Sequence, residues 1–154
     1  MGTAILVTAR LKSTRLKEKV LKPIQGRPML SHMMERLRLA EVPEQIIICT
    51  STVEQDDRLC EFAVSEGVEF YRGHPDDVLE RMLGAANAFG VETVISCTAD
   101  NPFVDPGYID KLAEFHKTEE NDFSRSEGLP FGTFAYALKR EAIKKACEIK
   151  DAVD

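Results

Sequence analysis

The 154-residue sequence lacks long hydrophobic runs, paired cysteines and an excess of positive charge, and each absence excludes a class of protein. Its longest apolar runs, such as Ile46-Ile47-Ile48-Cys49, are far too short to cross a bilayer, so we expect no membrane segment. The N-terminus has no charged segment followed by a long apolar stretch and a cleavage site, so we expect no secretory signal. These absences predict a cytoplasmic protein.

The cysteines are few and widely spaced. Cys49, Cys60, Cys97 and Cys147 form no CxxC pair, and no histidine stands at ligand spacing from them. This pattern argues against a zinc site and against a disulfide framework. We therefore predict reduced thiols, most of them in the core.

Acidic residues outnumber basic ones overall, but one short stretch is rich in positive charge. The net charge of −6 argues against a general nucleic-acid binder, which needs a broad basic face. Yet the stretch ARLKSTRLKEK, residues 9–19, carries five cations directly behind the apolar run at residues 5–7. Like charges crowded on one loop repel one another unless an anion bridges them. The stretch is therefore either a solvated basic loop or an anion site.

Hydrophobic periodicity predicts strands alternating with helices. Strands are expected at 4–8, 46–50, 68–71, 93–98 and 134–138, with helices after Pro28, after the caps Asp56 and Asp57, after Asp76 or Asp77, after Asp105-Pro106, and after the last strand. This alternation predicts one α/β domain of Rossmann-like type with a mostly parallel sheet. Ligands of such sheets bind beyond the carboxyl ends of the strands, where the basic loop is expected.

The basic loop has no familiar phosphate-binding glycine pattern. It contains neither GxxxxGK[ST] nor GxGxxG, so it is not a P-loop and carries no dinucleotide fingerprint. Side chains must therefore replace the glycines. Arg10, Ser13, Arg15 and Lys19 supply two planar forks, a hydroxyl and a point charge, which suit the several oxygens of a polyphosphate.

This loop resembles the signature of the cytidylyltransferases that make CMP-activated acid sugars. The likeness is greatest to their spore coat polysaccharide branch, with 3-deoxy-manno-octulosonate and acylneuraminate cytidylyltransferases as relatives. It extends over nearly the whole chain. The matching stretches are Ala9 to Leu21, Gly26-Arg27-Pro28-Met29-Leu30, 40–51, 72–81 and Thr98-Ala99-Asp100-Asn101-Pro102.

The resemblance implies a three-layer αβα nucleotidyltransferase fold, a substrate pair of CTP and a sugar, release of pyrophosphate, Mg²⁺ as cofactor, and a homodimer. It also implies site residues: Arg10, Ser13, Arg15 and Lys19 for the triphosphate, Asp100 for the metal, Ala9 and Thr98 around the pyrimidine, and Arg72 and Asp77 along the nucleotide pocket. Arg15, Lys19 and Asp100 would carry the catalysis. For two of these residues a structural role stays open, since Asp77 also reads as a helix N-cap and Asp100 as a turn or capping residue.

Two stretches depart from the family pattern. Where the family commonly has Pro-Gly before the loop lysine, this chain has Lys17-Glu18, which puts an anion beside the expected phosphate site. Where the spore coat branch tends to have Asp-Gly-x-Asp, the sequence reads Phe131-Gly132-Thr133-Phe134. This second change removes carboxylates from the expected acceptor side.

Length is a third departure, because family members continue with a dimer-forming segment and a further metal-binding aspartate. We expect residues 1–154 to be a single nucleotide-binding domain, truncated at its C-terminus, with a natural short form as the alternative. Two other functions stay open. One is a nucleotide-binding or assembly module without turnover, and the other is a glycosyltransferase that uses a nucleotide sugar, although Asp100-Asn101-Pro102 is not the usual Asp-x-Asp motif.

Overall fold

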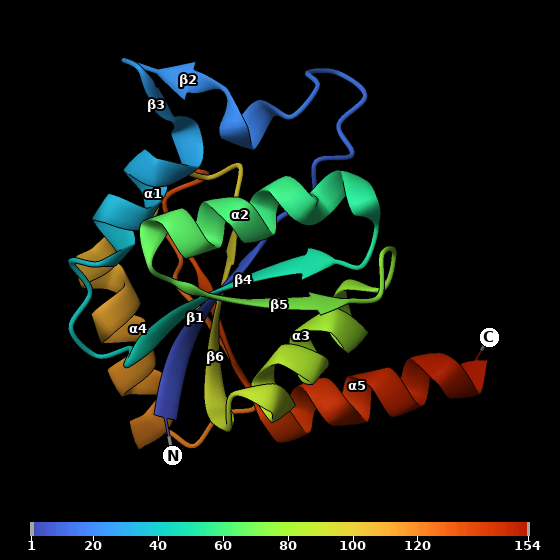
Figure 1. The fold of residues 1–154 in the computed structure, drawn as a ribbon. Coiled ribbons are helices and arrows are strands. Elements are labelled where there is room, and N and C mark those ends of the chain that lie inside the picture. Colours follow the sequence, from blue (N-terminus) through green and yellow to red (C-terminus); the bar gives the residue numbers. More distant parts are fainter. Residues whose placement is uncertain (1, 154) are drawn as a thin grey trace.

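A six-stranded sheet forms the centre of the protein (Figure 1). The computed structural model describes residues 2–153. In spatial order the strands are β5 (Glu69–Gly73), β4 (Gln45–Ser51), β1 (Gly2–Thr8), β6 (Val91–Thr98), β8 (Tyr136–Lys139) and β7 (Phe123–Arg125). The first four run parallel, whereas β8 is antiparallel to both β6 and β7. The predicted α/β fold with a mostly parallel sheet is confirmed.

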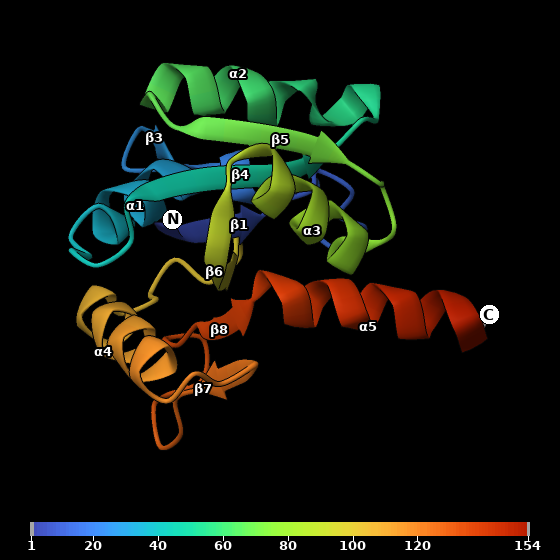
Figure 2. The same cartoon turned by 90° about the horizontal axis from the view of Figure 1, so that it is seen from below.

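Helices cover both faces of this sheet and make it a three-layer structure. They are α1 (Met29–Leu37), α2 (Asp57–Glu66), α3 (Val78–Ala88), α4 (Pro106–Thr118) and α5 (Arg140–Val153). The first two and α4 contribute to the core on one face, and α3 and α5 to the core on the other. Figure 2 shows α1 and α4 on one side of the strands and α3 and α5 on the opposite side.

The alternation of side chains along β1 explains this double covering. Ile5 and Val7 belong to the core under α1, α2 and α4, whereas Ala4 and Leu6 belong to the core under α3 and α5. Successive side chains of a strand point to opposite faces, so a strand buried on both faces needs an unbroken apolar run. The run at 4–7 is such a sequence, and its four residues are at most 1% exposed.

The predicted helix caps Asp77 and Asp105 are confirmed, whereas Asp56 occupies the N-cap position of α2 without a side-chain cap and Asp57 is the first residue of that helix. The carboxylates of Asp77 and Asp105 accept backbone hydrogen bonds from Glu80 and Tyr108, each at 3.0 Å, at the starts of α3 and α4. Asp56 precedes α2 but makes no capping hydrogen bond with its side chain. Its carboxylate instead faces the basic loop, where it has stronger donors.

Three groups of short elements, five elements in all, are absent from the sequence-based prediction. The hairpin of β2 (Pro23–Ile24) and β3 (Arg27–Pro28) turns through Gln25 and Gly26, whose φ values of 49° and 78° suit a type I′ turn. The edge strand β7 is the second group. The third comprises the 3-10 turns η1 (Lys19–Leu21) and η2 (Glu54–Asp56).

Cysteine burial agrees with the prediction of reduced core thiols. Cys49, Cys97 and Cys147 are buried, and Cys60 is partly buried. Burial raises the pKa of the Cys49 and Cys97 thiols to about 12. Among the helices of residues 2–153, none has the length and apolar character needed to cross a membrane.

Candidate active site

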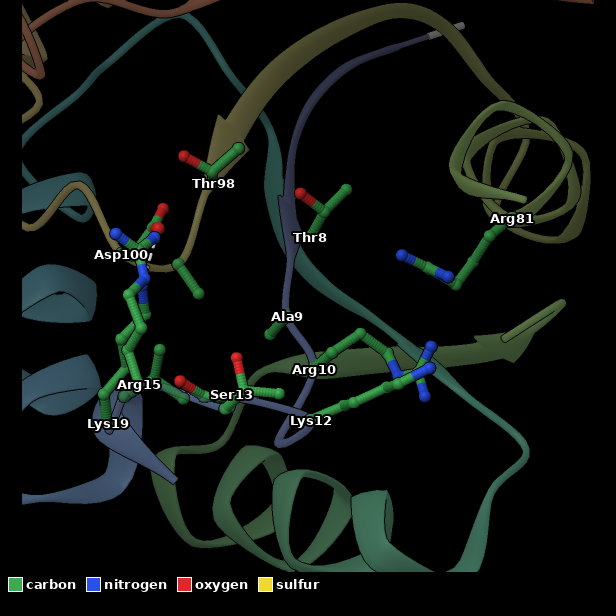
Figure 3. Close-up of a pocket in the computed structure, with 13 residues that line it drawn as sticks. Thr8, Ala9, Arg10, Lys12, Ser13, Arg15, Lys19, Arg81, Thr98 and Asp100 are labelled. Atoms are coloured by element: carbon green, nitrogen blue, oxygen red, sulfur yellow. Dashed lines mark hydrogen bonds and ion pairs between the residues drawn. The ribbon is translucent and has the colours of Figure 1, made fainter. Parts of the chain in front are cut away.

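A cavity of about 330 Å³ lies beyond the carboxyl ends of β1 and β6 (Figure 3). These neighbouring parallel strands end in register, with Thr8 opposite Thr98. The lining residues are Thr8, Ala9, Arg10, Lys12, Ser13, Thr14, Arg15, Lys19, Val20, Arg81, Thr98, Ala99 and Asp100. The location is the one predicted for the ligand of this sheet, and residues 8–20 supply most of the wall.

Buried apolar side chains fix both ends of the basic loop. Leu11 is 0% exposed and Val20 is 3% exposed, and both belong to the core under α1. At the start of the loop the amide of Ala9 donates to the carbonyl of Cys49 at 3.0 Å, which continues the pairing of β1 with β4. Of the cations between these anchors, Lys12, Arg15 and Lys19 line the cavity, and the burial of Leu11 and Val20 holds the loop against it.

Asp56 is a third anchor of the loop, and its carboxylate is only 1% exposed. It accepts hydrogen bonds from the backbone amide of Leu11 at 2.8 Å, from Nε of Arg10 and from the hydroxyl of Ser51. Burial raises the pKa of Asp56, but these donors and the charge of Arg10 outweigh it and bring the pKa below 3.8. Asp56 therefore stays ionised and orients Arg10.

Arg81 is a cavity residue that the sequence analysis did not identify. It reaches the cavity from α3, is 2% exposed, and donates from Nη1 to the carbonyl of His74 at 2.7 Å. Burial, with the nearby charge of Arg10, lowers its pKa. Its Nε has no hydrogen-bond partner within the described chain. A signal was present, because position 81 falls on the inward face of α3 with Met82 and Ala85, where a cation is unexpected.

Lys19 and Asp100 meet on the other side of the cavity. Nζ of Lys19 donates to Oδ2 of Asp100 at 2.9 Å, and this bond lowers the pKa of the carboxyl group against the smaller opposing effect of burial. Figure 3 shows Arg15 on the same side of the cavity as this pair. Asp100 is the one carboxylate among the residues that line the cavity.

Glu18, the unexpected anion of the loop, is not part of the cavity wall. Its carboxylate forms an ion pair with Arg58 of α2, which draws it away from the cations. The backbone at Glu18 is left-handed, with φ 52° and ψ 35°. Glycine adopts this conformation without strain, and the resembled family commonly has glycine here. Glu18 thus has the backbone conformation that suits glycine, while its side chain pairs with Arg58.

Two predicted nucleotide-pocket residues lie outside the cavity lining. Arg72 donates from Nε to the carbonyl of Ser51 at 2.9 Å and pairs with Asp57 at 2.6 Å. Asp77 caps α3 and pairs with Lys150. The other predicted site residues all line the cavity: Ala9, Arg10, Ser13, Arg15, Lys19, Thr98 and Asp100.

The charges of the wall suit a polyanion. Five cations line the cavity, and Asp100 is the one carboxylate in the lining, although Asp56 and Asp76 pair with Arg10 and Lys12 from outside it. Among residues 2–153 no three His, Cys, Asp or Glu side chains gather as a ready metal cluster. A magnesium ion bound through one carboxylate and substrate phosphates needs no such cluster, so Asp100 fits that type of site.

A family model described as cytidylyltransferase matches residues 4–153. The chain belongs to the cytidylyltransferase family. This membership confirms the resemblance seen in the basic loop.

Curated relatives of this cytidylyltransferase share about three residues in ten with it. The spore coat polysaccharide biosynthesis protein SpsF of Bacillus subtilis is 31% identical over 82% of this chain and 55% of its own length. The uncharacterized protein MJ1063 of Methanocaldococcus jannaschii is 30% identical over 92% of this chain and 58% of its own length. The 3-deoxy-manno-octulosonate cytidylyltransferase of Geobacter sulfurreducens is 28% identical over 72% of this chain and 44% of its own length. The chain spans about half the length of these relatives.

Solved structures share the fold. A cytidylyltransferase from Leptospira borgpetersenii superposes with a TM-score of 0.89 at 26% identity, covering 97% of this chain and 65% of that one. A CMP:2-keto-3-deoxy-manno-octonic acid synthetase, solved with CTP, superposes with a TM-score of 0.74 at 15% identity. The superposition covers 96% of this chain and 78% of that one. The second likeness concerns the fold alone.

Proposed function

We propose that this cytidylyltransferase transfers CMP from CTP to a sugar and releases pyrophosphate, in the synthesis of a surface or spore coat polysaccharide. The observation that carries the proposal is the cavity beyond β1 and β6, in which five cations face a single carboxylate. Family membership indicates the chemistry, and the charge of the cavity supplies what a triphosphate requires.

The chain's own residues divide the work between binding and leaving-group stabilisation. Arg10, Ser13, Arg15 and Lys19 hold the triphosphate. Arg15 and Lys19, beside Asp100, neutralise the charge that builds up on the departing pyrophosphate. The acceptor oxygen bonds to the α-phosphorus while the bond to the bridging oxygen breaks. The electron pair leaves with pyrophosphate, and the acceptor proton passes to solvent.

Magnesium is the cofactor we propose, with Asp100 as its protein ligand. When bound there it supplies positive charge next to the phosphate oxygens. Asp100 is suited to this role because its carboxylate lines the cavity and remains 47% exposed. Oxygen ligands from one carboxylate, phosphates and water match the preference of this cation.

Base recognition is proposed at the ends of β1 and β6. Ala9 and Thr98, at the ends of β1 and β6, line the cavity and are our candidates for contacts around the pyrimidine. Arg72 and Asp77 stay predictions of the resemblance alone, since each is engaged elsewhere. A cytoplasmic location and a homodimer likewise stay predictions.

Calorimetric titration with CTP, ATP and UTP, with and without magnesium, tests the proposal. We expect selective CTP binding that magnesium strengthens. Arg15→Ala should weaken CTP binding about tenfold or more, because a charge-assisted hydrogen bond contributes about 1.5–3 kcal/mol. The matched control is Arg27→Ala, which removes an arginine paired with Glu35 on the surface hairpin. Unchanged affinity in Arg15→Ala would count against the assignment.

Pyrophosphate release distinguishes the enzyme from a binding module without turnover. The stretch at residues 131–134 favours the binding module, since it has phenylalanines where the spore coat branch tends to have carboxylates. Steady pyrophosphate release from CTP in the presence of an acceptor sugar would eliminate the module. Tight CTP binding without release for any sugar would favour it.

A further inference from the structure

Arg81 is the only buried arginine among the residues that the structure describes, with 2% of its surface exposed. It extends from α3 to the nucleotide cavity, and Figure 3 shows its guanidinium group pointing into that cavity, towards Thr8. Burying a cation costs free energy unless hydrogen bonds or an anion compensate it. The partners of this group therefore decide whether the fold alone explains its position.

The guanidinium group of Arg81 is hydrogen-bonded through one nitrogen only. Nη1 donates to the carbonyl of His74 at 2.7 Å and to the carbonyl of Pro75 at 3.3 Å. Within the described chain Nε has no partner, and Nη2 makes no hydrogen bond. These two nitrogens donate from one edge of the planar group. A buried donor without a partner is costly, and a ligand that accepts from it removes that cost.

The other two cations at this end of the cavity already have anionic partners. Nε of Arg10 pairs with the carboxylate of Asp56, and Nζ of Lys12 lies 3.9 Å from that of Asp76. Arg81 forms no ion pair with any residue in the described part of the chain. Its free edge is thus the donor group for which the protein itself supplies no acceptor.

Close packing fixes the position of Arg81. A Cβ atom added at Gly73, the last residue of β5, would lie 3.0 Å from Cγ of Arg81 and 2.8 Å from Cε1 of Tyr71. Glycine at this position therefore allows β5 and the side chain of Arg81 to approach closely. The next residue, Met82, belongs to the core under α3 and α5. The free edge is preorganised for a ligand because the side chain has no room to turn away.

The two ends of the cavity differ in chemistry (Figure 3). Arg15, Lys19 and Asp100 lie at one end, where we place the metal and the departing pyrophosphate. Arg81 lies at the opposite end, and Ala9 lies between the two. A nucleoside triphosphate whose departing phosphates are at Lys19 therefore has its nucleoside near Ala9 and Arg81.

We propose that Arg81 determines the specificity for cytosine, by donating from its Nε–Nη2 edge to N3 and O2 of the base. The proposal rests on the CMP-transfer function proposed above. Cytosine carries these two acceptors side by side. Uracil has an N3–H donor next to O2, so its donor would face a donor of the guanidinium group. Arginine recognises the adjacent acceptors of guanine in DNA by the same bidentate geometry.

The burial of Arg81 favours a base over a phosphate as its partner. With 2% of its surface exposed, a ligand reaches one edge of the group and does not surround it. A pyrimidine presents two acceptors in one plane, which match that edge, and requires no further cation. A phosphate has tetrahedrally arranged oxygens, which are better served by accessible cations such as Lys12, whose side chain is 69% exposed.

Calorimetric titration of the full chain with CTP and UTP, in the presence of magnesium, tests the proposal. The wild type should prefer CTP about tenfold to a hundredfold, the usual discrimination of a bidentate arginine against the wrong base. Arg81→Gln and Arg81→Lys should both lose most of this preference, chiefly by weaker CTP binding. Lysine cannot replace arginine here because an ammonium group is a point charge and not a planar fork.

Arg125→Gln is the matched control for these variants. This arginine pairs with Glu127, has a side chain that is 59% exposed, and lies outside the cavity lining. Its replacement should leave the preference for CTP at the wild-type value.

Base analogues test the same contact in the unmodified chain, so this result does not depend on the folding of a variant. The triphosphate of 3-deazacytidine has a C–H group in place of N3 and should bind about tenfold more weakly than CTP. The triphosphate of the pyrimidin-2-one nucleoside keeps N3 and O2 and lacks only the 4-amino group, so it should lose less affinity. In Arg81→Lys the difference between CTP and the 3-deaza analogue should disappear.

The outcomes separate this proposal from the CMP-transfer function. A preference for CTP that survives in both Arg81 variants, or equal binding of CTP and its 3-deaza analogue, would overturn the role of Arg81 alone. A greater loss for the pyrimidin-2-one analogue would also overturn it and assign recognition to the 4-amino group. Equal weakening of CTP and UTP in Arg81→Gln, restored by Arg81→Lys, would make Arg81 a phosphate contact instead. Selective binding that depends on Arg81 without pyrophosphate release would keep the base contact and overturn CMP transfer.

Discussion

Lys19 and Asp100, which are 81 positions apart in sequence, form an ion pair with 2.9 Å between Nζ and Oδ2. Their side chains are 36% and 47% exposed, so solvent screens the pair and it contributes less than about 1 kcal/mol to folding. Its importance lies in the site. The pair joins the last cation of the basic loop to the proposed metal ligand, so the proposal implies that phosphate binding at Lys19 and metal binding at Asp100 are coupled.

Replacing Asp100 with Asn separates these two roles. The variant should bind CTP without magnesium as well as the wild type or better, because the anion opposing the phosphates is gone. It should lose the strengthening by magnesium, and CMP transfer should fall about a hundredfold or more. Calorimetry with and without magnesium and a pyrophosphate-release assay provide the measurements.

Asp122→Asn is the control for this prediction, since it removes an exposed carboxylate that does not line the nucleotide cavity. Its magnesium response and transfer rate should match the wild type. If Asp100→Asn kept the full magnesium response, the metal would be held elsewhere and the assignment of Asp100 would be wrong.

Asp56→Asn should weaken the attachment of the basic loop, residues 9–19, to the segment before α2. The substitution keeps the size of the side chain but removes the charge that holds Arg10 and the amide of Leu11. We expect a loss of about 2 kcal/mol in the free energy of unfolding, the usual contribution of hydrogen bonds to a buried charge. CTP affinity should fall as well, although Asp56 does not line the cavity. Urea unfolding and calorimetry measure the two effects.

The pH dependence of Asp56 has a defined sign. Its folded-state pKa lies below the unfolded value of 3.8, so the unfolded chain binds the proton more readily. The stabilisation is complete above that unfolded value and is lost as the pH falls through the folded-state pKa. The difference between wild type and Asp56→Asn should therefore be constant at neutral pH and shrink only in acid. A difference that disappears near neutral pH would contradict this account.

The regular part of the fold was predictable because periodicity and caps act locally. The apolar run at 4–7 predicts a buried strand, and Asp77 and Asp105 predict helix starts, each from a few neighbouring residues. The edge strand β7 was not predictable, since three residues show no period and their pairing depends on β8. The expected strand at 134–138 begins two residues later, at Tyr136, because its pairing with β6 ends at Ser96 opposite Tyr136.

The site was predictable where its residues are contiguous. The basic loop is recognisable in the sequence by its concentration of positive charge. The roles of Arg81 and Asp56 depend instead on contacts with other segments of the chain. In the sequence alone, an arginine within a helix such as Arg81 is interpreted as a surface residue unless its position on the inward face is noticed. An aspartate before a helix, such as Asp56, is interpreted as a helix cap. Only the fold reveals that Asp56 faces Leu11, 45 residues away in sequence.

His116 should make the stability of the protein sensitive to mildly acidic pH. It is 1% exposed on α4, and Nδ1 lies 2.9 Å from the hydroxyl of Ser124. Burial lowers its pKa below 6.5, the charge of Lys139 lowers it further, and Asp122 opposes them. The neutral form is thus favoured in the folded chain, and its stabilisation is complete above the unfolded value and lost as the pH falls below it.

Urea unfolding at about pH 7.5 and about pH 5.5 measures this effect, since histidine titrates between these values. The wild type should lose more stability on acidification than His116→Gln, which retains a polar side chain beside Ser124 but does not titrate there. The difference between the two chains is the readout, because other histidines contribute equally to both. Equal losses would show that His116 is not responsible.

Glu18→Gly tests whether the loop before Lys19 carries backbone strain. A non-glycine residue at φ 52° costs about 1 kcal/mol, which glycine avoids. The ion pair with Arg58 is half exposed and returns only a few tenths of that. Glu18→Gly should therefore be as stable as the wild type or up to about 1 kcal/mol more stable. Glu18→Ala keeps the strain and loses the pair, so it should be the least stable of the three in urea unfolding. A glycine variant less stable than the alanine variant would mean that strain is absent and that the ion pair holds this part of the loop.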